Sequence, residues 1–207
     1  ELNELSSLTN HLREKSDLDR NHVRTAIDLL IQEDGDANTK ADFLVALAEK
    51  GESQQEITHF VSCFRELARD PGLEDFAPRA IDLCGTGGDK AGSFNVSTFV
   101  SFVLASAGVP VIKHGNRSIS SKCGSADLLE AIGIPLDPEL SRIKEGLKEL
   151  DFAFLFAPSF HPAFKHIAPV RKELASRGII TIFNRLGPMI NPAQPAFQVL
   201  GVYDPRY

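Results

Sequence analysis

In the first 75 residues, apolar positions recur at helical spacing. The clearest stripe, after Ser53, repeats every three or four residues and places its members on one face of a helix. Glu56 follows Ser53 by three residues, which matches a capping box. Similar runs after Asp19 and Thr39 predict two further helices, with Thr39 expected to cap the second. The stripe consists of Ile57, Phe60, Val61, Phe64 and Leu67. Residues 1–75 therefore predict a small all-helical domain.

From about residue 76 the pattern changes, because short apolar runs now alternate with helical segments. The runs at 80–83, 109–112, 152–156, 179–183 and 199–202 predict strands, and 96–107, 126–132, 140–150 and 170–175 predict helices. This alternation indicates parallel strands joined by crossover helices. We therefore expect an α/β fold, with a small N-terminal helical domain and a larger α/β domain over 76–207. The chain stops just after the last predicted strand, so we expect the mainly parallel sheet to be incomplete.

Composition and charge narrow the class of protein. The 207 residues carry a net charge of −6, which argues against a nucleic-acid-binding surface. The three cysteines (Cys63, Cys84 and Cys123) are an odd number without metal-ligand spacing, as expected of a reduced, cytoplasmic protein. No apolar stretch is long enough to span a membrane, so a membrane is not an expected partner. Because of the negative net charge, a nucleic acid is not an expected partner either.

Residues 81–98 predict a strand, a glycine turn and a helix start. The apolar run that ends at Leu83 leads into Gly85, Gly87 and Gly88, and Asn95-Val-Ser-Thr98 opens the next apolar segment. Glycines let a ligand approach the backbone, and the first amides of a helix attract anions. Lys90 stands where a dinucleotide fingerprint needs glycine, and the Walker pattern is absent. The alternative is a tight connection without a ligand.

A second polar loop follows the predicted strand 109–112. Its cations are Lys113, Arg117 and Lys122, and its hydroxyls include Ser118, Ser120 and Ser121. Open α/β sheets bind ligands at the carboxyl ends of their strands, and arginine can bind phosphate with two hydrogen bonds. Two such loops indicate a ligand with more than one phosphate.

Three other polar features leave alternatives open. We expect Asp127 to cap the helix 126–132 rather than to bind a ligand. His161 is either a core histidine or, with His166 and Arg171, part of a polar pocket wall. The breaker-rich loop 184–192 either shapes the backbone only or contributes to a site. No zinc motif or nucleophile elbow is present.

These motifs together resemble the anthranilate phosphoribosyltransferase family over essentially the whole chain, including Ala41–Leu44 in the helical part. The matching segments are Gly85–Asp89, Asn95–Thr98, Lys113–Arg117 with Ser120-Ser121, Gly124–Asp127, His161–Ala163, Val170-Arg171, Phe183-Asn184, Leu186–Pro188 and Asn191-Pro192. Nucleoside phosphorylases share the architecture, but their lysine loop reads differently. Phosphorolysis of a nucleoside and nucleic-acid binding by a non-catalytic relative are therefore the alternatives.

The resemblance implies transfer of the phosphoribosyl group of 5-phosphoribosyl 1-diphosphate to the amine of anthranilate in tryptophan biosynthesis, with Mg²⁺ as cofactor. It also implies a cytoplasmic homodimer formed through the helical domain, with the donor bound in the domain at 76–207. The implied catalytic residues are Lys113, His114 and Arg171, with His114 not an obligatory general base, and the implied metal ligand is Ser97. The implied substrate-binding residues are Gly85, Gly88, Asp89, Ser93, Asn95, Val96, Ser97, Thr98, Lys113, Gly115, Asn116, Arg117, Ser118, Ile119, Ser120, Ser121, Ser125, His161 and Arg171.

The chain departs from the family pattern after Arg171. The segment that follows is about three residues longer than usual by alignment, and Arg177 is the candidate to replace an arginine lost from it. Arg185 stands where the family usually has an apolar residue. The family's acidic Mg²⁺ ligands are expected beyond residue 207.

Overall fold

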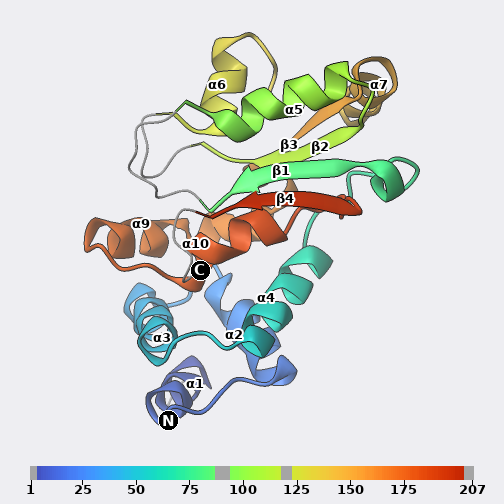
Figure 1. Cartoon of the computed structure of the whole chain (residues 1–207). Helices are drawn as coiled ribbons and strands as arrows, with labels where there is room; N and C mark the ends of the chain where they lie inside the picture. The colour runs from blue at the N-terminus through green and yellow to red at the C-terminus, as the bar shows by residue number, and fades with distance from the viewer. Residues whose placement is uncertain (1–3, 87–93, 118–122, 203–207) are drawn as a thin grey trace. The chain divides into compact units, whose positions relative to one another are not determined.

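The computed structural model describes residues 4–86, 94–117 and 123–202 of the chain (Figure 1). The chain divides into two compact units. The helical unit comprises Glu1–Ala68 and His161–Ile190, and the sheet unit comprises Arg69–Phe160 and Asn191–Tyr207. Within the described residues, no helix has the length and apolar content needed to cross a membrane.

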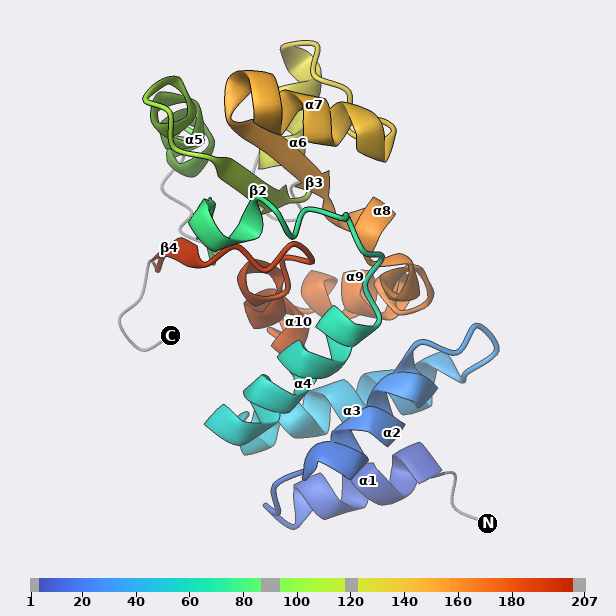
Figure 2. The ribbon, with the colours of Figure 1, turned by 90° about the vertical axis from the view of Figure 1, so that its right-hand side faces the viewer.

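The helical unit is built from two separate stretches of sequence. Its first four helices are α1 (Glu4–Arg13), α2 (Arg20–Leu30), α3 (Ala37–Lys50) and α4 (Gln54–Glu66), and its last two are α9 (Ala168–Ser176) and α10 (Ile182–Leu186). Figure 2 shows α9 and α10 beside α3 and α4, although they are far apart in the sequence. Short 3₁₀ turns at Pro162–His166 and Gly187–Met189 complete the unit.

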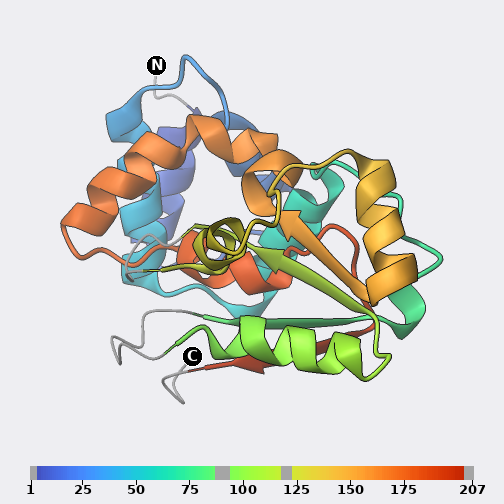
Figure 3. The same ribbon diagram turned by 90° about the horizontal axis from the view of Figure 1, so that it is seen from above.

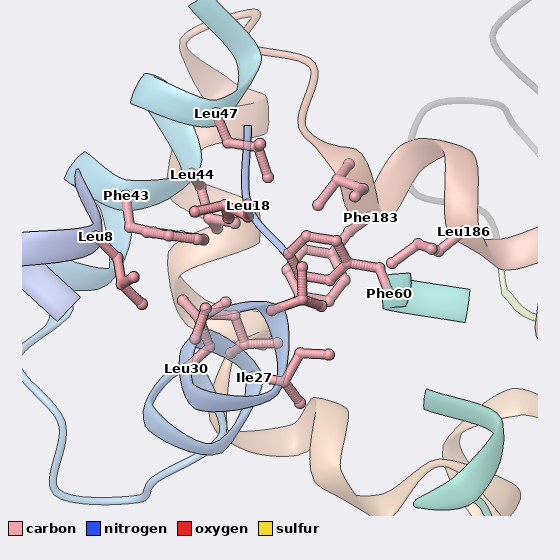
Figure 4. Close-up of a cluster of buried hydrophobic side chains, with 14 of the residues drawn as sticks. Leu8, Leu18, Ile27, Leu30, Phe43, Leu44, Leu47, Phe60, Phe183 and Leu186 are labelled. Atoms are coloured by element: carbon pink, nitrogen blue, oxygen red, sulfur yellow. The ribbon is translucent and has the colours of Figure 1, made fainter. Parts of the chain in front are cut away.

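One hydrophobic core joins these two stretches. Phe43, Phe60 and Phe64 are almost completely buried in it, and Phe183 and Leu186 of α10 belong to the same cluster (Figure 4). Burial of such side chains stabilises the fold by roughly 1.5–3 kcal/mol each. Because this cluster includes residues beyond 160, the helical unit contains more of the chain than the predicted domain 1–75, whose boundary stays a prediction.

Polar side chains fix the ends of these helices. The predicted capping box is confirmed, since Glu56 N donates to Ser53 Oγ and Ser53 N donates to Glu56 Oε2. The predicted cap at Thr39 is wrong: Asp36 caps α3, and its Oδ2 accepts from Thr39 N at 2.7 Å and from Thr39 Oγ1 at 2.8 Å. A carboxylate is the stronger acceptor, so the helix begins three residues earlier.

The sheet unit confirms the predicted α/β fold. Its four parallel strands, in the order β3-β2-β1-β4, are β1 (Ile81–Gly85), β2 (Val111–Gly115), β3 (Phe152–Phe156) and β4 (Phe197–Gly201). The helices are α5 (Val96–Ser106), α6 (Ser125–Ala131), α7 (Leu140–Leu150) and α8 (Ala157–Phe160), after a 3₁₀ turn at Ala77–Arg79.

Alternation along the strands directs side chains to helices on both faces of the sheet. Leu83 and Val111 pack with Ala105 of α5. Ile112 and Leu155 instead pack with Ile143 and Leu147 of α7. Figure 3 shows α5 and α7 on opposite sides of the strands. Strands buried in this way read as continuous apolar runs, which is why the sequence predicted them.

The predicted strand at 179–183 is wrong, because helix α10 begins at Ile182. Asn184 Oδ1 accepts from Thr181 N at 2.9 Å and from Thr181 Oγ1 at 3.3 Å, so polar groups cap the helix at its first turn. Ile182 and Phe183 are then buried in the helical core. Capping and burial outweigh the strand propensity of the β-branched residues in this segment.

A buried ion pair at the start of α4 generates a stability prediction. Glu56 is fully buried and accepts from Leu18 N, Ser53 N and Lys50 Nζ at 2.9, 2.7 and 2.8 Å. Glu56→Gln removes one of the two carboxylates that pair with Lys50, the other being Asp17 at 2.6 Å, and we expect it to lower the free energy of unfolding by about 2 kcal/mol in urea titrations. The exposed neighbour Glu49→Gln is the control, and an equal loss in both variants would contradict the assignment.

Candidate functional site

The first turn of α5 lies beside the turn that precedes α6. Asn95 precedes α5, and its Nδ2 donates to Gly124 O at 3.0 Å. The carbonyl of Asn116 accepts from Ala126 N at 3.3 Å and from Ser125 Oγ at 3.4 Å. These contacts bring the predicted substrate-binding residues Asn95, Asn116 and Ser125 together at one end of the sheet unit.

Lys113 is the buried cation of this region. It is 2% exposed, and its Nζ donates to the carbonyl of Leu83 in β1 and to Ser97 Oγ at 3.3 Å. Burial lowers the pKa of the Lys113 amine, and the negative charge of Asp82 opposes that shift. The amine therefore links β1 and β2 to the first turn of α5.

Two buried polar residues near Lys113, Asp82 and Asn191, were not among the predicted site residues. Asp82, fully buried in β1, accepts from His114 N at 3.3 Å and from Asn191 Nδ2 at 3.1 Å. Burial raises the pKa of the Asp82 carboxyl, while Asn191, Lys113 and His114 N lower it. The signal in the sequence was a charged residue between Ile81 and Leu83, in the middle of an apolar run.

Gly115, the last residue of β2, lies where a side chain would not fit. A Cβ at this position would lie 2.3 Å from Ser125 Oγ and 2.7 Å from Phe154 Cε2. Both neighbours come from packed elements, and Phe154 is buried. A glycine therefore lets the start of α6 lie directly against the end of β2.

The guanidinium of Arg117 is hydrogen-bonded to two acidic side chains. Its two terminal nitrogens bind Glu130 at 2.7 and 2.8 Å, and Nη1 also contacts Asp127 at 3.2 Å. These hydrogen bonds raise the pKa of Arg117, first through Glu130 and then through Asp127. Asp127 Oδ2 also accepts from Gly124 N at 2.8 Å, which confirms its predicted role at the start of α6.

The first turn of α5 carries two hydroxyl side chains, those of Ser97 and Thr98. Thr98 is fully buried, and its Oγ1 has no hydrogen-bond partner among the described residues. Ser97 Oγ accepts from Lys113. No group of three His, Cys, Asp or Glu side chains in the described part of the chain is arranged to hold a metal ion. Ser97 therefore fits Mg²⁺ only as a single hydroxyl ligand beside phosphate oxygens.

In the helical unit, Arg171 rests on aromatic rings. Its guanidinium carbon lies 4.9 Å from the ring centre of Phe183 and 6.0 Å from that of Phe164. Within the described residues it forms no ion pair. Burial lowers the pKa of Arg171, and the ring faces partly compensate for lost water. Among the described residues, the arginine is thus held by aromatic rings and by no carboxylate.

His161 belongs to the core of the same unit. It is buried, stacks on Phe164 at 5.3 Å between ring centres, and places Nε2 2.9 Å from Ile190 O. Burial lowers the pKa of His161 to about 4, so the ring is neutral at pH 7. Of the two interpretations, the structure favours the core histidine.

Two arginines that follow Arg171, where the chain departs from the family pattern, both form ion pairs. Arg177, the candidate replacement arginine, pairs with Glu173 at 3.2 Å on the exposed side of α9. Arg185 pairs with the buried side chain of Glu52 at 3.3 Å.

Gly85 ends β1 and pairs in register with Gly201. Of the remaining predicted residues, Gly88, Asp89, Ser93, Ser118, Ile119, Ser120 and Ser121 lie outside the described residues.

Comparison with known proteins gives close relatives. The anthranilate phosphoribosyltransferase of Caldicellulosiruptor saccharolyticus is 47% identical over 190 residues, covering 92% of this chain and 55% of the relative. That of Persephonella marina is 44% identical over 193 residues, covering 93% and 56%. The chain thus spans about half the length of the curated relatives it matches.

Solved structures agree with this similarity. Anthranilate phosphoribosyltransferase (TrpD) from Thermus thermophilus superposes with a TM-score of 0.82 at 40% identity, over 96% of this chain and 59% of that one. The Saccharomyces cerevisiae enzyme in complex with PRPP and Mg gives 0.77 at 26% identity, over 97% and 59%.

Two family models divide the chain between them. Residues 6–68 match the helical bundle domain of the glycosyl transferase family, and residues 77–207 match its a/b domain. The second match alone covers more than half of the sequence. This chain therefore belongs to the glycosyl transferase family that the two models describe.

Proposed function

We propose that the whole protein transfers the phosphoribosyl group of 5-phosphoribosyl 1-diphosphate to the amine of anthranilate, releasing diphosphate, in tryptophan biosynthesis. The observation that carries the proposal is the buried Lys113 amine bound to Ser97 Oγ at the start of α5, at the carboxyl ends of parallel strands. The names of the relatives support it. The yeast relative has been solved both with PRPP and Mg and with 4-fluoroanthranilate.

The sheet unit would bind the donor. As the bond from C1 of the ribose to diphosphate breaks, negative charge accumulates on the leaving group. Lys113 and the first amides of α5 are fixed before the reaction, so they stabilise that charge without reorganising. Thr98 Oγ1 offers a buried hydroxyl to a phosphate oxygen. We assign the donor to these groups, with Gly85, Asn95, Val96, Gly115 and Ser125 around them and Gly88, Asp89, Ser93 and 118–121 as further candidates. Asn116 is a candidate contact of anthranilate, as the resemblance implies.

Arg117 would bind phosphate only by exchanging partners. Its bonds link the exposed side chains of Arg117 and Glu130 and the partly buried Asp127, and pairs at the protein surface typically stabilise a protein by only about 0–1 kcal/mol. A diphosphate carries more charge than either carboxylate and offers the same two-oxygen geometry. The exchange is therefore inexpensive.

The acceptor would bind in the helical unit through Arg171. A guanidinium without a carboxylate partner suits the carboxylate of anthranilate, and Phe183 and Phe164 suit its ring. The aromatic amine is neutral at pH 7, so the new C–N bond forms without prior deprotonation, and the resulting ammonium then gives its proton to water or to the released diphosphate. His114 is therefore not needed as a general base, and the core histidine His161, neutral at pH 7, would act only indirectly, by packing against Phe164.

We further propose a requirement for Mg²⁺, which would neutralise the diphosphate, with Ser97 Oγ as one ligand. The resemblance also leads us to propose a cytoplasmic homodimer formed through the helical domain. The proposed domain limits are 1–75 and 76–207.

The reaction is tested by the loss of anthranilate fluorescence on adding 5-phosphoribosyl 1-diphosphate and Mg²⁺ to the full-length protein. We expect a loss that requires the donor and disappears when the metal is chelated. Phosphorolysis of a nucleoside in place of this reaction would overturn the proposal.

Arg171→Ala should raise the KM for anthranilate at least about tenfold, because a charge-assisted bidentate hydrogen bond is lost. The KM for the donor should change little. Arg13→Ala, an exposed arginine of α1, is the matched control. Equal effects on both KM values would contradict a specific role in acceptor binding.

Gly115→Ala should weaken donor binding about tenfold, because the new Cβ has to push the start of α6 away from β2. Isothermal titration calorimetry with the donor and Mg²⁺ measures the change. Gly201→Ala is the control, since a Cβ there meets nothing closer than 3.7 Å. Unchanged binding in Gly115→Ala would show that the close packing is irrelevant to the donor.

A further inference from the structure

The ladder between β1 and β2 is much shorter than the other two ladders of the sheet. In the described strands these two pair in register only at Ile81 and Val111. By contrast, β1 with β4 and β2 with β3 pair along their full length. The carboxyl ends of β1 and β2, which carry the two predicted anion loops, are therefore not joined by regular pairing.

Buried side chains connect the strands where the ladder stops. Asp82 in β1 accepts from the backbone N–H of His114 in β2 at 3.3 Å. Lys113 in β2 donates in the opposite direction, to the carbonyl of Leu83 in β1. Buried backbone groups need partners, and here a carboxylate and an ammonium supply them.

Asn191 fixes the carboxylate from the other side. Its Nδ2 donates to Asp82 Oδ2 at 3.1 Å and to Ile112 O at 2.9 Å, while its Oδ1 accepts from Ala193 N at 3.0 Å. Asn191 is 2% exposed. Both protons of Nδ2 and the oxygen Oδ1 thus have a specific partner, and Nδ2 requires an acceptor oxygen from residue 82.

We propose that Asp82 and Asn191 are a positioning pair for the donor site, which holds the end of β2 in place and keeps the Lys113 amine directed at Ser97. The pair does not touch the reacting atoms in this arrangement. It acts through the backbone of 112–114 and through the charge that faces Lys113. The ligand named here is the donor of the proposed function, so the inference rests on that function for its binding assay.

Asp82→Asn is the sharpest test, because it keeps the shape of the side chain while it changes the hydrogen-bond pattern and removes the charge that faces Lys113. The new amide has one acceptor for two donors, so either His114 N or Asn191 Nδ2 faces an NH₂ group. In the full-length protein we expect about tenfold weaker donor binding by calorimetry, with the donor KM raised by the same factor and the anthranilate KM unchanged.

The reciprocal swap is the rescue. In Asp82→Asn combined with Asn191→Asp, the amide at 82 accepts from His114 N and donates to the carboxylate at 191. The bond to Ile112 O is replaced by a contact between two oxygens, so recovery is partial: donor binding should be tighter than in either single variant and remain weaker than in the parent. Asp137→Asn, an exposed aspartate of the sheet unit, removes the same charge and should bind the donor normally.

Amide hydrogen exchange provides a readout that does not need the donor. Asp82→Asn should accelerate exchange in peptides from β2, while peptides from α2 and α4 keep the parent rates. If Asp82→Asn does not fold, Asn191→Ser, which leaves the carboxylate in place, should show the same two changes.

Faster exchange throughout the protein with unchanged donor binding would overturn the inference and leave the pair a purely structural feature. Failure of the parent protein to bind the donor would instead overturn the proposed function. In that case faster exchange confined to β2 would still support the positioning role, and parent rates in β2 would overturn it.

Discussion

A buried carboxylate between two parallel strands is the interaction on which the rest of the sheet unit depends. Burying Asp82 is unfavourable unless its oxygens are hydrogen-bonded, and His114 N and Asn191 Nδ2 satisfy them. The same carboxylate offsets the cost of burying Lys113 nearby. Neither the Asp82 carboxylate nor the Lys113 ammonium would be stable if it were buried alone. The two buried charges and the interrupted ladder between β1 and β2 therefore depend on one another.

This arrangement explains how the sheet can present a cation and two loops at one edge. A continuous ladder would use the backbone groups of Leu83 and His114 in strand pairing. Where the ladder stops, Leu83 O accepts from the Lys113 side chain and His114 N donates to Asp82. The ladder of β2 with β3 continues undisturbed, so the end of β2 keeps one rigid neighbour while the other is replaced by side chains.

Periodicity predicted most of the fold, since buried parallel strands and amphipathic helices both leave clear patterns. It failed at 179–183 because Ile179, Ile180 and Ile182 have strand propensity, whereas the Thr181–Asn184 cap and core burial decide the outcome. The motifs likewise identified Lys113 and Ser97, which the structure brings together. Asp82 escaped notice because its partner Asn191 is far away in sequence, and only tertiary structure shows that the two meet.

The neighbouring residues Ile190 and Asn191 form buried hydrogen bonds in different units of the chain. Ile190 O contacts His161 Nε2 within the helical unit, whereas Asn191 is bonded to Asp82 and Ile112 within the sheet unit. Consecutive residues thus have buried partners in different units. A substitution at His161 acts first on the packing around Phe164 and Arg171, and one at Asn191 acts first on β1 and β2. The breaker-rich loop 184–192 therefore does more than turn the chain, because its last residues fix the polar groups of both units.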